Sequence, residues 1–217
     1  MGLPVTRGRF IAFEGGEGAG KSTQSRLLCE ALEKRGTPVI ATREPGGTPG
    51  AEAIRTLLLH PPGKGWGARA EALLFAAARS DHVERLIEPS LAAGKWIICD
   101  RFVDSSRAYQ GAAGALGDEQ VTSLHAIGSS GMLPDLTILL TAAEKDTGER
   151  VKARDGDAND AIGGRSATYH QSVNRAFLNF AKNEPERFAV IDGSGTIDEV
   201  HDRIMEAIAP LMGKLGQ

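Results

Sequence analysis

A glycine-rich run that ends in lysine and serine is the clearest chemical signal in the sequence. Its residues, from Gly15 to Ser22, fit the spacing G-x-x-x-x-G-K-[ST] and directly follow the apolar run Phe10–Phe13. Glycines allow positive φ, so several backbone N–H groups can turn toward one polyphosphate at the start of the next helix. Lys21 adds a positive charge, and Ser22 offers a hydroxyl to Mg²⁺.

The predicted ligand of this run is a nucleoside triphosphate. A flexible surface loop is the alternative, but the apolar strand before the run and the amphipathic stretch 24–34 after it disfavour that interpretation. The residues expected to contact the triphosphate are Gly15, Gly16, Glu17, Gly18, Ala19, Gly20, Lys21, Ser22 and Thr23.

A second polar cluster follows the apolar run Trp96–Cys99. An acidic side chain at that strand end, Asp100, reaches Mg²⁺ directly or through water, so Ser22 and Asp100 are the predicted metal ligands. The next residue, Arg101, would face a phosphate. A strand-end Asp is also a common helix N-cap. Considered alone, Asp100 could therefore be either a metal ligand or an N-cap.

Arg43 lies just after a third apolar run, Pro38–Thr42. A guanidinium there can donate paired N–H groups to a second phosphate, whereas the alternative is a solvated loop residue. Ligands gather at the carboxyl ends of parallel strands, so the strand-end position favours the phosphate role.

Phe75 and Arg79 are four residues apart in a predicted helix and therefore share one face. The ring can stack on a flat base while the guanidinium bonds to the edge of that base. By spacing alone, however, Phe75 fits a core position and Arg79 fits a rim position that covers apolar surface.

The segment 154–165 combines glycines with charged residues and has no apolar period. One interpretation is a mobile lid over the ligand cleft, and the other is a disordered surface loop. Long loops in compact domains are often functional, which favours the lid.

Five apolar runs alternate with segments that are compatible with helices. Strands are predicted at Phe10–Phe13, Pro38–Thr42, Trp96–Cys99, Leu136–Thr141 and Phe188–Ile191. Helices are predicted at Lys21–Arg35, Ala51–Leu59, Ala68–Ala93, Asp118–Ser129, Glu144–Ala153, Thr168–Asn183 and Ile197–Leu211. This alternation predicts an α/β fold in three layers (α/β/α) with a five-stranded parallel sheet. Since no linker divides the 217 residues, residues 1–217 are expected to form a single domain.

The composition limits the partners and the compartment. A net charge of −3 gives no electrostatic footprint for nucleic acid or an anionic membrane, and no apolar run reaches the length of a membrane span. Cys29 and Cys99 suit buried free thiols in a reducing compartment better than a disulfide. A cytoplasmic protein with small-molecule partners is therefore expected.

Six segments of the chain resemble the thymidylate kinase family, in family order and at family spacing over nearly the whole sequence. They are 13–23 (FEGGEGAGKST), 42–48 (TREPGGT), 74–79 (LFAAAR), 100–102 (DRF), 108–111 (AYQG) and 133–137 (LPDLT). The resemblance implies a P-loop NTPase-type fold and an enzyme that uses ATP and Mg²⁺ to phosphorylate dTMP to dTDP in dTTP biosynthesis. It also implies a homodimer.

The resemblance assigns roles around the sugar and phosphate of dTMP. Glu17 corresponds to the family's acidic residue at the 3′-hydroxyl of the deoxyribose. Arg43 and Arg101 correspond to the clamps on the acceptor phosphate. Tyr109 corresponds to an aromatic that packs where a 2′-hydroxyl would lie.

The resemblance also assigns roles around the base. Phe75 corresponds to the residue that stacks on thymine, and Arg79 to the residue that bonds to O4. Ser105 or Ser106 corresponds to a position near N3. These implied roles override the core and rim interpretations of Phe75 and Arg79.

Two forms of the family differ in whether the catalytic arginine lies in the phosphate loop or in the lid. The loop position after Glu17 is Gly18 in this chain, so the resemblance implies an arginine from the lid. Family lids often read Asp-Arg-Ile, whereas this chain reads Asp160-Ala161-Ile162. The candidates are Arg154, Arg150 and Arg165.

Two other functions stay open at this point. Another nucleotide or deoxynucleoside kinase would need an edge donor other than Arg79 and more room beside Tyr109. A nucleotide-dependent switch of the GTPase kind would need a base-specific N-K-x-D sequence after a later strand, and the sequence contains none.

Overall fold

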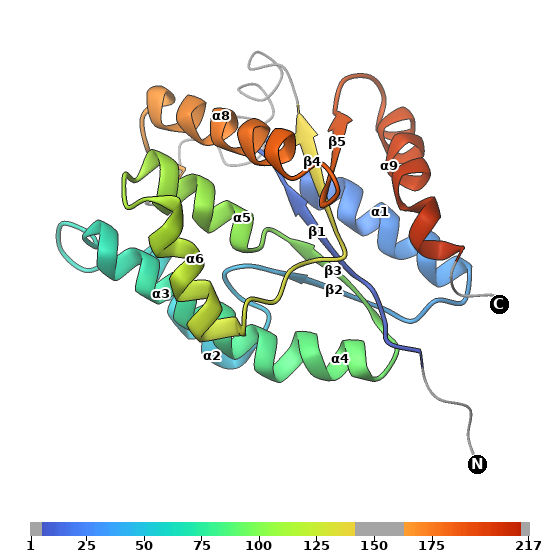
Figure 1. Ribbon diagram of the computed structural model, residues 1–217, viewed down its shortest axis with the longest axis horizontal. Coiled ribbons are helices and arrows are strands. Elements are labelled where there is room, and N and C mark those ends of the chain that lie inside the picture. Colours follow the sequence, from blue (N-terminus) through green and yellow to red (C-terminus); the bar gives the residue numbers. More distant parts are fainter. Residues whose placement is uncertain (1–5, 142–162, 214–217) are drawn as a thin grey trace.

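Five parallel strands form the sheet at the centre of the molecule (Figure 1). The computed structural model describes residues 6–141 and 163–213. The strands are β1 (Phe10–Glu14), β2 (Val39–Arg43), β3 (Trp96–Asp100), β4 (Leu136–Thr141) and β5 (Phe188–Asp192). Their order across the sheet is β2-β3-β1-β4-β5, and all the pairings are parallel. The predicted strands and the α/β class are confirmed.

Helices cover both faces of this sheet (Figure 1). On one face lie α1 (Lys21–Lys34) and α9 (Ile197–Met212). The helices of the other side are α2 (Pro49–Leu59), α3 (Ala68–His82), α4 (Glu88–Ala92), α5 (Val103–Ser106), α6 (Asp118–Ser129) and α8 (Ala167–Asn183). The predicted three-layer arrangement is therefore confirmed.

The core divides between the two faces because successive strand side chains point in opposite directions. On β1, Ile11 and Phe13 pack with α1 and α9, whereas Phe10 and Ala12 pack toward the other layer. All of β1 is buried, and its neighbours are β3 and β4. The strand order reverses at β1, so the carboxyl end of this strand is where a ligand site is expected.

The predicted helix Ala68–Ala93 is helical throughout but not regular. A π-helical turn, Val83–Ile87 (η1), separates α3 from α4, and there the Glu88 N–H donates to the Val83 carbonyl, five residues back. Pro89 follows, and because proline has no N–H to continue the regular ladder, the turn before it widens.

A helical segment absent from the sequence prediction lies at residues 103–113. There α5 continues into π-helical turns at Arg107–Ala113 (η2). Even the polar Arg107 and Gln110 are buried, and both donate hydrogen bonds to carboxylates of neighbouring helices. A segment buried on nearly all sides shows no amphipathic period, which explains why the pattern did not indicate a helix.

Some predictions fall on residues that the structure does not describe. The predicted helix Glu144–Ala153 and most of the predicted lid, 154–165, lie outside the described residues. Cys29 and Cys99 are free buried thiols, as predicted. Within the part of the chain that the structure describes, none of the helices combines the length and the apolar character needed to cross a membrane.

Candidate active site

The glycine-rich run forms the loop between β1 and α1. The φ angle is 136° at Gly15, 71° at Gly18 and 94° at Gly20, so the predicted positive-φ glycines are confirmed. At Gly15 a Cβ atom would stand 2.4 Å from the Leu140 carbonyl oxygen, so only glycine fits there. Gly20 caps α1 without a side chain, which leaves the N–H groups of the first turn able to bind a phosphate.

Lys21, the first residue of α1, is buried and folds back onto the loop. Its Nζ donates to the carbonyl oxygens of Gly15 at 3.0 Å and Gly16 at 2.7 Å. Burial lowers the pKa of Lys21 to about 7, and the positive charge of Arg101 contributes to that shift. Because neutral carbonyl oxygens compensate a buried charge poorly, an anionic phosphate would be a better partner.

The two residues predicted to bind Mg²⁺ are in contact. The Ser22 hydroxyl donates to Asp100 Oδ2 at 2.7 Å. Asp100 Oδ1 is buried and has no hydrogen-bond partner among the described residues. A buried carboxylate oxygen without a donor is available to a cation, so this oxygen set fits Mg²⁺.

Arg101 follows Asp100 with a φ of 71°, in the left-handed region that non-glycine residues rarely adopt. Its Nη1 donates to Ser105 Oγ at 3.1 Å and to the Gly15 carbonyl at 3.4 Å. Its guanidinium carbon lies 5.2 Å from the centre of the Tyr109 ring. Such a backbone conformation persists where surrounding contacts enforce it, and here it directs the guanidinium toward the phosphate loop.

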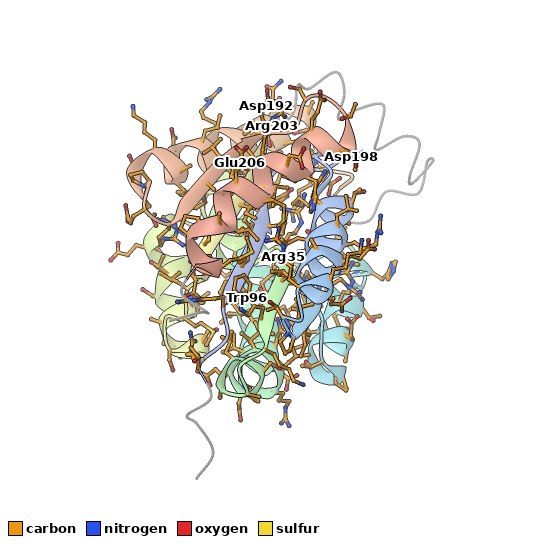
Figure 2. The ribbon with its side chains drawn as sticks, turned by 90° about the vertical axis from the view of Figure 1, so that its right-hand side faces the viewer. Arg35, Trp96, Asp192, Asp198, Arg203 and Glu206 are labelled. Atoms are coloured by element: carbon orange, nitrogen blue, oxygen red, sulfur yellow. The ribbon has the colours of Figure 1, made fainter. Side chains whose placement is uncertain are left out.

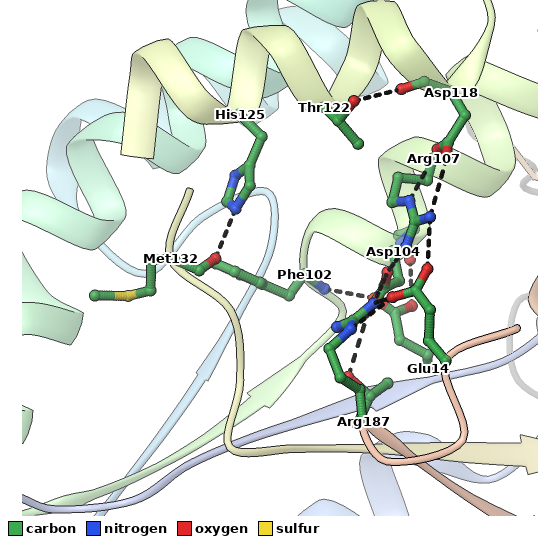
Figure 3. Close-up of polar contacts among 12 residues, drawn as sticks. Glu14, Phe102, Asp104, Arg107, Asp118, Thr122, His125, Met132 and Arg187 are labelled. Atoms are coloured by element: carbon green, nitrogen blue, oxygen red, sulfur yellow. Dashed lines mark hydrogen bonds and ion pairs between the residues drawn. The ribbon is translucent and has the colours of Figure 1, made fainter. Parts of the chain in front are cut away.

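Glu14, the last residue of β1, supplies several of those contacts. Its Oε1 accepts the N–H of Phe102 at 2.8 Å (Figure 3) and the N–H of Ser105 at 3.0 Å. Its Oε2 accepts the Ser105 hydroxyl at 2.6 Å. Burial, together with the nearby Asp104 carboxylate, raises the pKa of Glu14 to about 7. A fully buried carboxylate thus ties the end of β1 to the turn that carries Arg101.

An ionic cluster behind Glu14 joins this turn to the outer helices (Figure 3). Asp104 accepts hydrogen bonds from Arg107 at 2.8 Å and from Arg187 at 3.1 Å. Arg107 also donates to Asp118 at 2.8 Å and to Glu184 at 2.8 Å. These pairs fix α5 and η2 against α6 and against the segment after α8.

A pocket opens beside the phosphate loop, with about 570 Å³ of empty space that includes its solvent-filled mouth. The predicted acceptor-binding residues that line it are Glu17, Phe75, Arg79, Arg101, Ser105, Ser106 and Tyr109. The remaining wall consists of Glu44, Pro45, Arg55, Leu59, Phe102 and Gln110.

Arg79 is buried in the wall of this pocket, with only 3% of its surface exposed. Its Nε donates to Glu44 Oε2 at 2.7 Å, and its Nη2 donates to Ser106 Oγ at 2.8 Å. The rim position that spacing alone favours for Arg79 is therefore wrong. Arg79 can be buried because the carboxylate of Glu44, which directly follows β2 and lies 35 residues away in sequence, compensates its charge.

Arg43 stands apart from the pocket. Its side chain is 55% exposed, and its Nη2 donates to Glu52 Oε1 at 2.9 Å. The same carboxylate oxygen accepts the Gly47 N–H at 3.0 Å. Arg43 would have to leave Glu52 in order to reach an acceptor phosphate.

Of the three lid-arginine candidates, Arg165 is described, whereas Arg150 and Arg154 lie outside the described residues. Arg165 donates to Glu71 Oε2 at 2.5 Å and to the Tyr169 hydroxyl. Arg165 is therefore paired with a carboxylate of α3 and with a side chain of α8.

The polar loop after β5 lies against the phosphate loop. A Cβ atom at Gly193 would stand 3.6 Å from the Ala19 carbonyl oxygen. Arg203 of α9 donates to the carbonyl oxygens of Asp192 at 2.6 Å and Ser194 at 2.7 Å, and Figure 2 shows Arg203 beside Asp192. The loop after β5 is thus held next to the predicted triphosphate site and outside the lining of the pocket.

Sequence reasoning missed Glu14, Glu44 and His82. Glu14 carries a signal that could have identified it, because an acidic residue at the end of a fully apolar strand needs a specific partner. Glu44 lies in the quoted segment 42–48, but its partner is on another element. Nothing in the local spacing marks His82, since its contacts are with Thr42 and Glu44, 40 and 38 residues away in sequence.

The chain matches known proteins over nearly its whole length. The thymidylate kinase family model matches residues 13–204. A thymidylate kinase of Rhizorhabdus wittichii is 53% identical over 206 residues, which cover 94% of this chain and 99% of the relative. One from Rhodopseudomonas palustris is 50% identical over 204 residues, or 93% and 89% of the two chains. The crystal structure of thymidylate kinase from Ehrlichia chaffeensis superposes with a TM-score of 0.76 at 30% identity, over 93% of this chain and 99% of that one. The chain therefore belongs to the thymidylate kinase family.

Proposed function

We propose that the pocket beside the phosphate loop binds dTMP and that the loop binds ATP, so that the γ-phosphoryl group passes to dTMP and gives dTDP. Membership of the family makes the chain an ATP:dTMP phosphotransferase that acts in dTTP synthesis. The observation that carries the site assignment is the single pocket that joins Arg79 to Arg101 and Glu17. One ligand with a flat base, a sugar and a phosphate would span these residues.

For the base, Arg79 is proposed to donate to O4 of thymine and Phe75 to stack on the ring, with Ser105 or Ser106 near N3. The burial of Arg79 supports this role, because a buried donor discriminates more strongly than a solvated one. A 4-amino group in place of O4 would leave that donor unpaired, at a cost of about 1–3 kcal/mol.

For the sugar and phosphate, Tyr109 is proposed to exclude a 2′-hydroxyl and Glu17 to contact the 3′-hydroxyl. Arg101 and Arg43 are proposed to clamp the acceptor phosphate. The 5.2 Å between the Arg101 guanidinium and the Tyr109 ring supports a sugar space that adjoins the cation. In this proposal, Arg43 exchanges its surface contact with Glu52 for the phosphate.

For the donor, Lys21 and the backbone of residues 15–23 are proposed to bind the triphosphate. A phosphate would replace the Gly15 and Gly16 carbonyl oxygens as the partner of Lys21. Ser22 and Asp100 would hold Mg²⁺, whose charge, when the ion is bound, neutralises the donor phosphates.

Phosphoryl transfer proceeds through a loose transition state, so alignment and charge neutralisation are the main tasks of the protein. The acceptor phosphate is already ionised near neutral pH, so the reaction needs no general base. A lid arginine is proposed to supply the last positive charge because Gly18 leaves the phosphate loop without one. Arg154 is the first choice for this role, followed by Arg150 and Arg165.

We also propose a single-domain subunit that pairs with a second copy in the cytoplasm. Leu73 of α3 is 56% exposed and Ile127 of α6 is 84% exposed, on two helices that contact each other. Apolar side chains exposed to this degree support a partner surface there. The free thiols of Cys29 and Cys99 support a reducing compartment. Neither a nucleic acid nor a membrane is proposed as a partner.

A turnover assay with ATP, Mg²⁺ and a panel of acceptors tests the proposed function. We expect dTDP and ADP from dTMP, and a kcat/KM at least about tenfold lower with thymidine and with other nucleoside monophosphates. Preferred turnover of another acceptor would assign the chain to a different nucleotide or nucleoside kinase. ATP binding without transfer to any acceptor would favour a nucleotide switch.

A further inference from the structure

A buried carboxylate lies between Arg79 and His82. Glu44 Oε2 accepts Nε of Arg79 at 2.7 Å, and Glu44 Oε1 lies 3.1 Å from Nδ1 of His82. The exposed fractions are 5% for Glu44, 3% for Arg79 and 0% for His82, so water cannot replace either partner. Each carboxylate oxygen therefore has one buried side chain that fixes it.

His82 is itself fixed on its other side. Its Nε2 lies 2.8 Å from Thr42 Oγ1 on β2. A neutral ring with its proton on Nδ1 satisfies both contacts, because Nδ1–H donates to Glu44 and Nε2 accepts the Thr42 hydroxyl. The backbone closes the remaining space, since a Cβ atom at Gly47 would stand 2.6 Å from Nε2. The ring cannot turn without breaking two hydrogen bonds.

These contacts determine how the guanidinium of Arg79 lies in the pocket wall. Its Nε donates a hydrogen bond to Glu44, and its Nη2 donates to Ser106 Oγ at 2.8 Å and to the Phe102 carbonyl oxygen at 3.4 Å. Two anchored nitrogens fix the plane of a guanidinium, and Nη1 is the nitrogen that the described contacts leave for a ligand.

We propose that His82 is a positioning residue for base recognition: it holds Glu44, and through Glu44 it fixes the direction in which Arg79 presents its free nitrogen to the base. The inference rests on the proposed binding of the dTMP base beside Arg79. His82 does not line the pocket, so its proposed effect is on which pyrimidine is accepted. When His82 is lost, Glu44 can rotate, and the donor of Arg79 no longer meets O4 at one fixed angle.

The primary test is His82→Leu, which removes both ring nitrogens and keeps an apolar side chain. We expect KM for dTMP to rise about tenfold while kcat changes by less than about threefold. The ratio of kcat/KM for dTMP to that for dCMP should fall about tenfold. His82→Asn keeps a donor near the position of Nδ1 and should recover much of the ratio, which keeps the test decisive if His82→Leu folds poorly.

A matched control is His125→Leu. His125 is another buried histidine, but its Nε2 lies 2.6 Å from the Met132 carbonyl oxygen and its ring packs on Phe102. This variant should lose stability to a similar degree and keep the wild-type dTMP to dCMP ratio. A ratio that falls equally in both histidine variants would mean that general loosening is responsible and would overturn the proposal.

Coupling to Arg79 completes the test. In an Arg79→Ala background, His82→Leu should leave the ratio unchanged within about twofold, because the donor that it positions is gone. A tenfold fall of the ratio on adding His82→Leu to Arg79→Ala would overturn the proposal that His82 acts on Arg79 through Glu44. A wild-type chain without preference for dTMP over dCMP would overturn the proposed role of Arg79 and this inference with it. A wild-type preference that survives unchanged in folded His82→Leu would overturn this inference alone.

Discussion

Arg79 and Lys21 are both buried cations at the candidate site, but their partners differ. Arg79 pairs with the Glu44 carboxylate at 2.7 Å, whereas Lys21 donates to the carbonyl oxygens of Gly15 and Gly16. A directly bonded carboxylate compensates a buried charge, while neutral carbonyl oxygens do so poorly, and the carboxylates near Lys21 offset only part of the effect of its burial. The lowered pKa of Lys21, at about 7, reflects that burial. We therefore expect Arg79 to keep its partner when ligands bind and Lys21 to exchange its carbonyl partners for an anion.

The same contrast extends to the neighbours of each cation. We call the first region the base side, which consists of Arg79, Glu44, His82 and Ser106. We call the second region the phosphate side, which consists of Lys21, Ser22, Asp100 and Arg43. On the phosphate side, Asp100 Oδ1 has no partner among the described residues and Arg43 is bound to Glu52 at the surface. Ligands should therefore rearrange the phosphate side and leave the base side in place.

The largest effect is expected from the loss of the lid arginine, which lies outside the phosphate side but would complete its positive charge. Arg154→Ala should lower kcat by about 10³-fold or more with little change in dTMP affinity, because an arginine in this role acts mainly in the transition state. Arg165→Ala should lower kcat less, since Arg165 is paired with Glu71. Steady-state kcat and calorimetric dTMP affinity, measured also for Arg150→Ala, give the comparison. If none of the three lowers kcat by more than about tenfold, the lid-arginine mechanism is wrong.

The next effect comes from Lys21 itself. Lys21→Met should lower kcat by about 10²–10³-fold, because it removes a preorganised positive charge from the donor phosphates. Lys34→Met is a matched control at the exposed far end of the same helix, and it should keep the wild-type rate. Circular dichroism checks that both variants are folded. Near-normal turnover by folded Lys21→Met would remove Lys21 from the phosphate side.

Substrate selection measures how rigid the base side is. We expect kcat/KM for dCMP to be about 10–100-fold below that for dTMP, because a 4-amino group leaves the buried donor of Arg79 unpaired. A comparison of UMP with dUMP isolates the 2′-hydroxyl, which Tyr109 should exclude. Comparable efficiency with dCMP would contradict the role of Arg79, and equal use of UMP and dUMP would contradict the role of Tyr109.

The smallest effect concerns stability without ligand. The pKa of Lys21 in the folded chain, about 7, lies below its ordinary value of 10.5, so the unfolded chain binds more protons between these values. Burying Lys21 therefore costs stability fully below about pH 7, and the cost disappears as the pH rises through 10.5. Lys21→Met should melt a few degrees above wild type at about pH 6, with a difference that shrinks toward about pH 10. A difference in Tm that stays constant or grows with pH would contradict the uncompensated burial of Lys21.

The sequence predicts that the phosphate loop, Ser22 and Asp100 lie together, and it predicts the base side only in part. The loop and Ser22 come directly after β1, Asp100 ends β3, and a parallel sheet brings these strand ends to one edge whatever the packing details. Phe75 and Arg79 share a helix face, which spacing does indicate. Whether that face is a pocket wall or a rim depends on contacts across the fold.

Those contacts have no local signature. Glu44 lies 35 residues from Arg79, and Thr42 lies 40 residues from His82, so no periodicity links them. The π-helical turns could not be predicted from the sequence pattern either. The turn η1 depends on Pro89 within an otherwise regular helical pattern, and η2 depends on burial by several elements. Long-range polar pairing and irregular helical turns are thus what the sequence pattern could not supply.

A structure of the chain with dTMP, Mg²⁺ and a non-hydrolysable ATP analogue tests the contrast between the two sides most directly. The account predicts that Arg79 keeps its hydrogen bond to Glu44 and meets the base through Nη1. It also predicts that Lys21 Nζ leaves the Gly15 and Gly16 carbonyl oxygens for a phosphate oxygen. An Arg79 that has left Glu44, or a Lys21 that keeps both carbonyl contacts in the ternary complex, would contradict it.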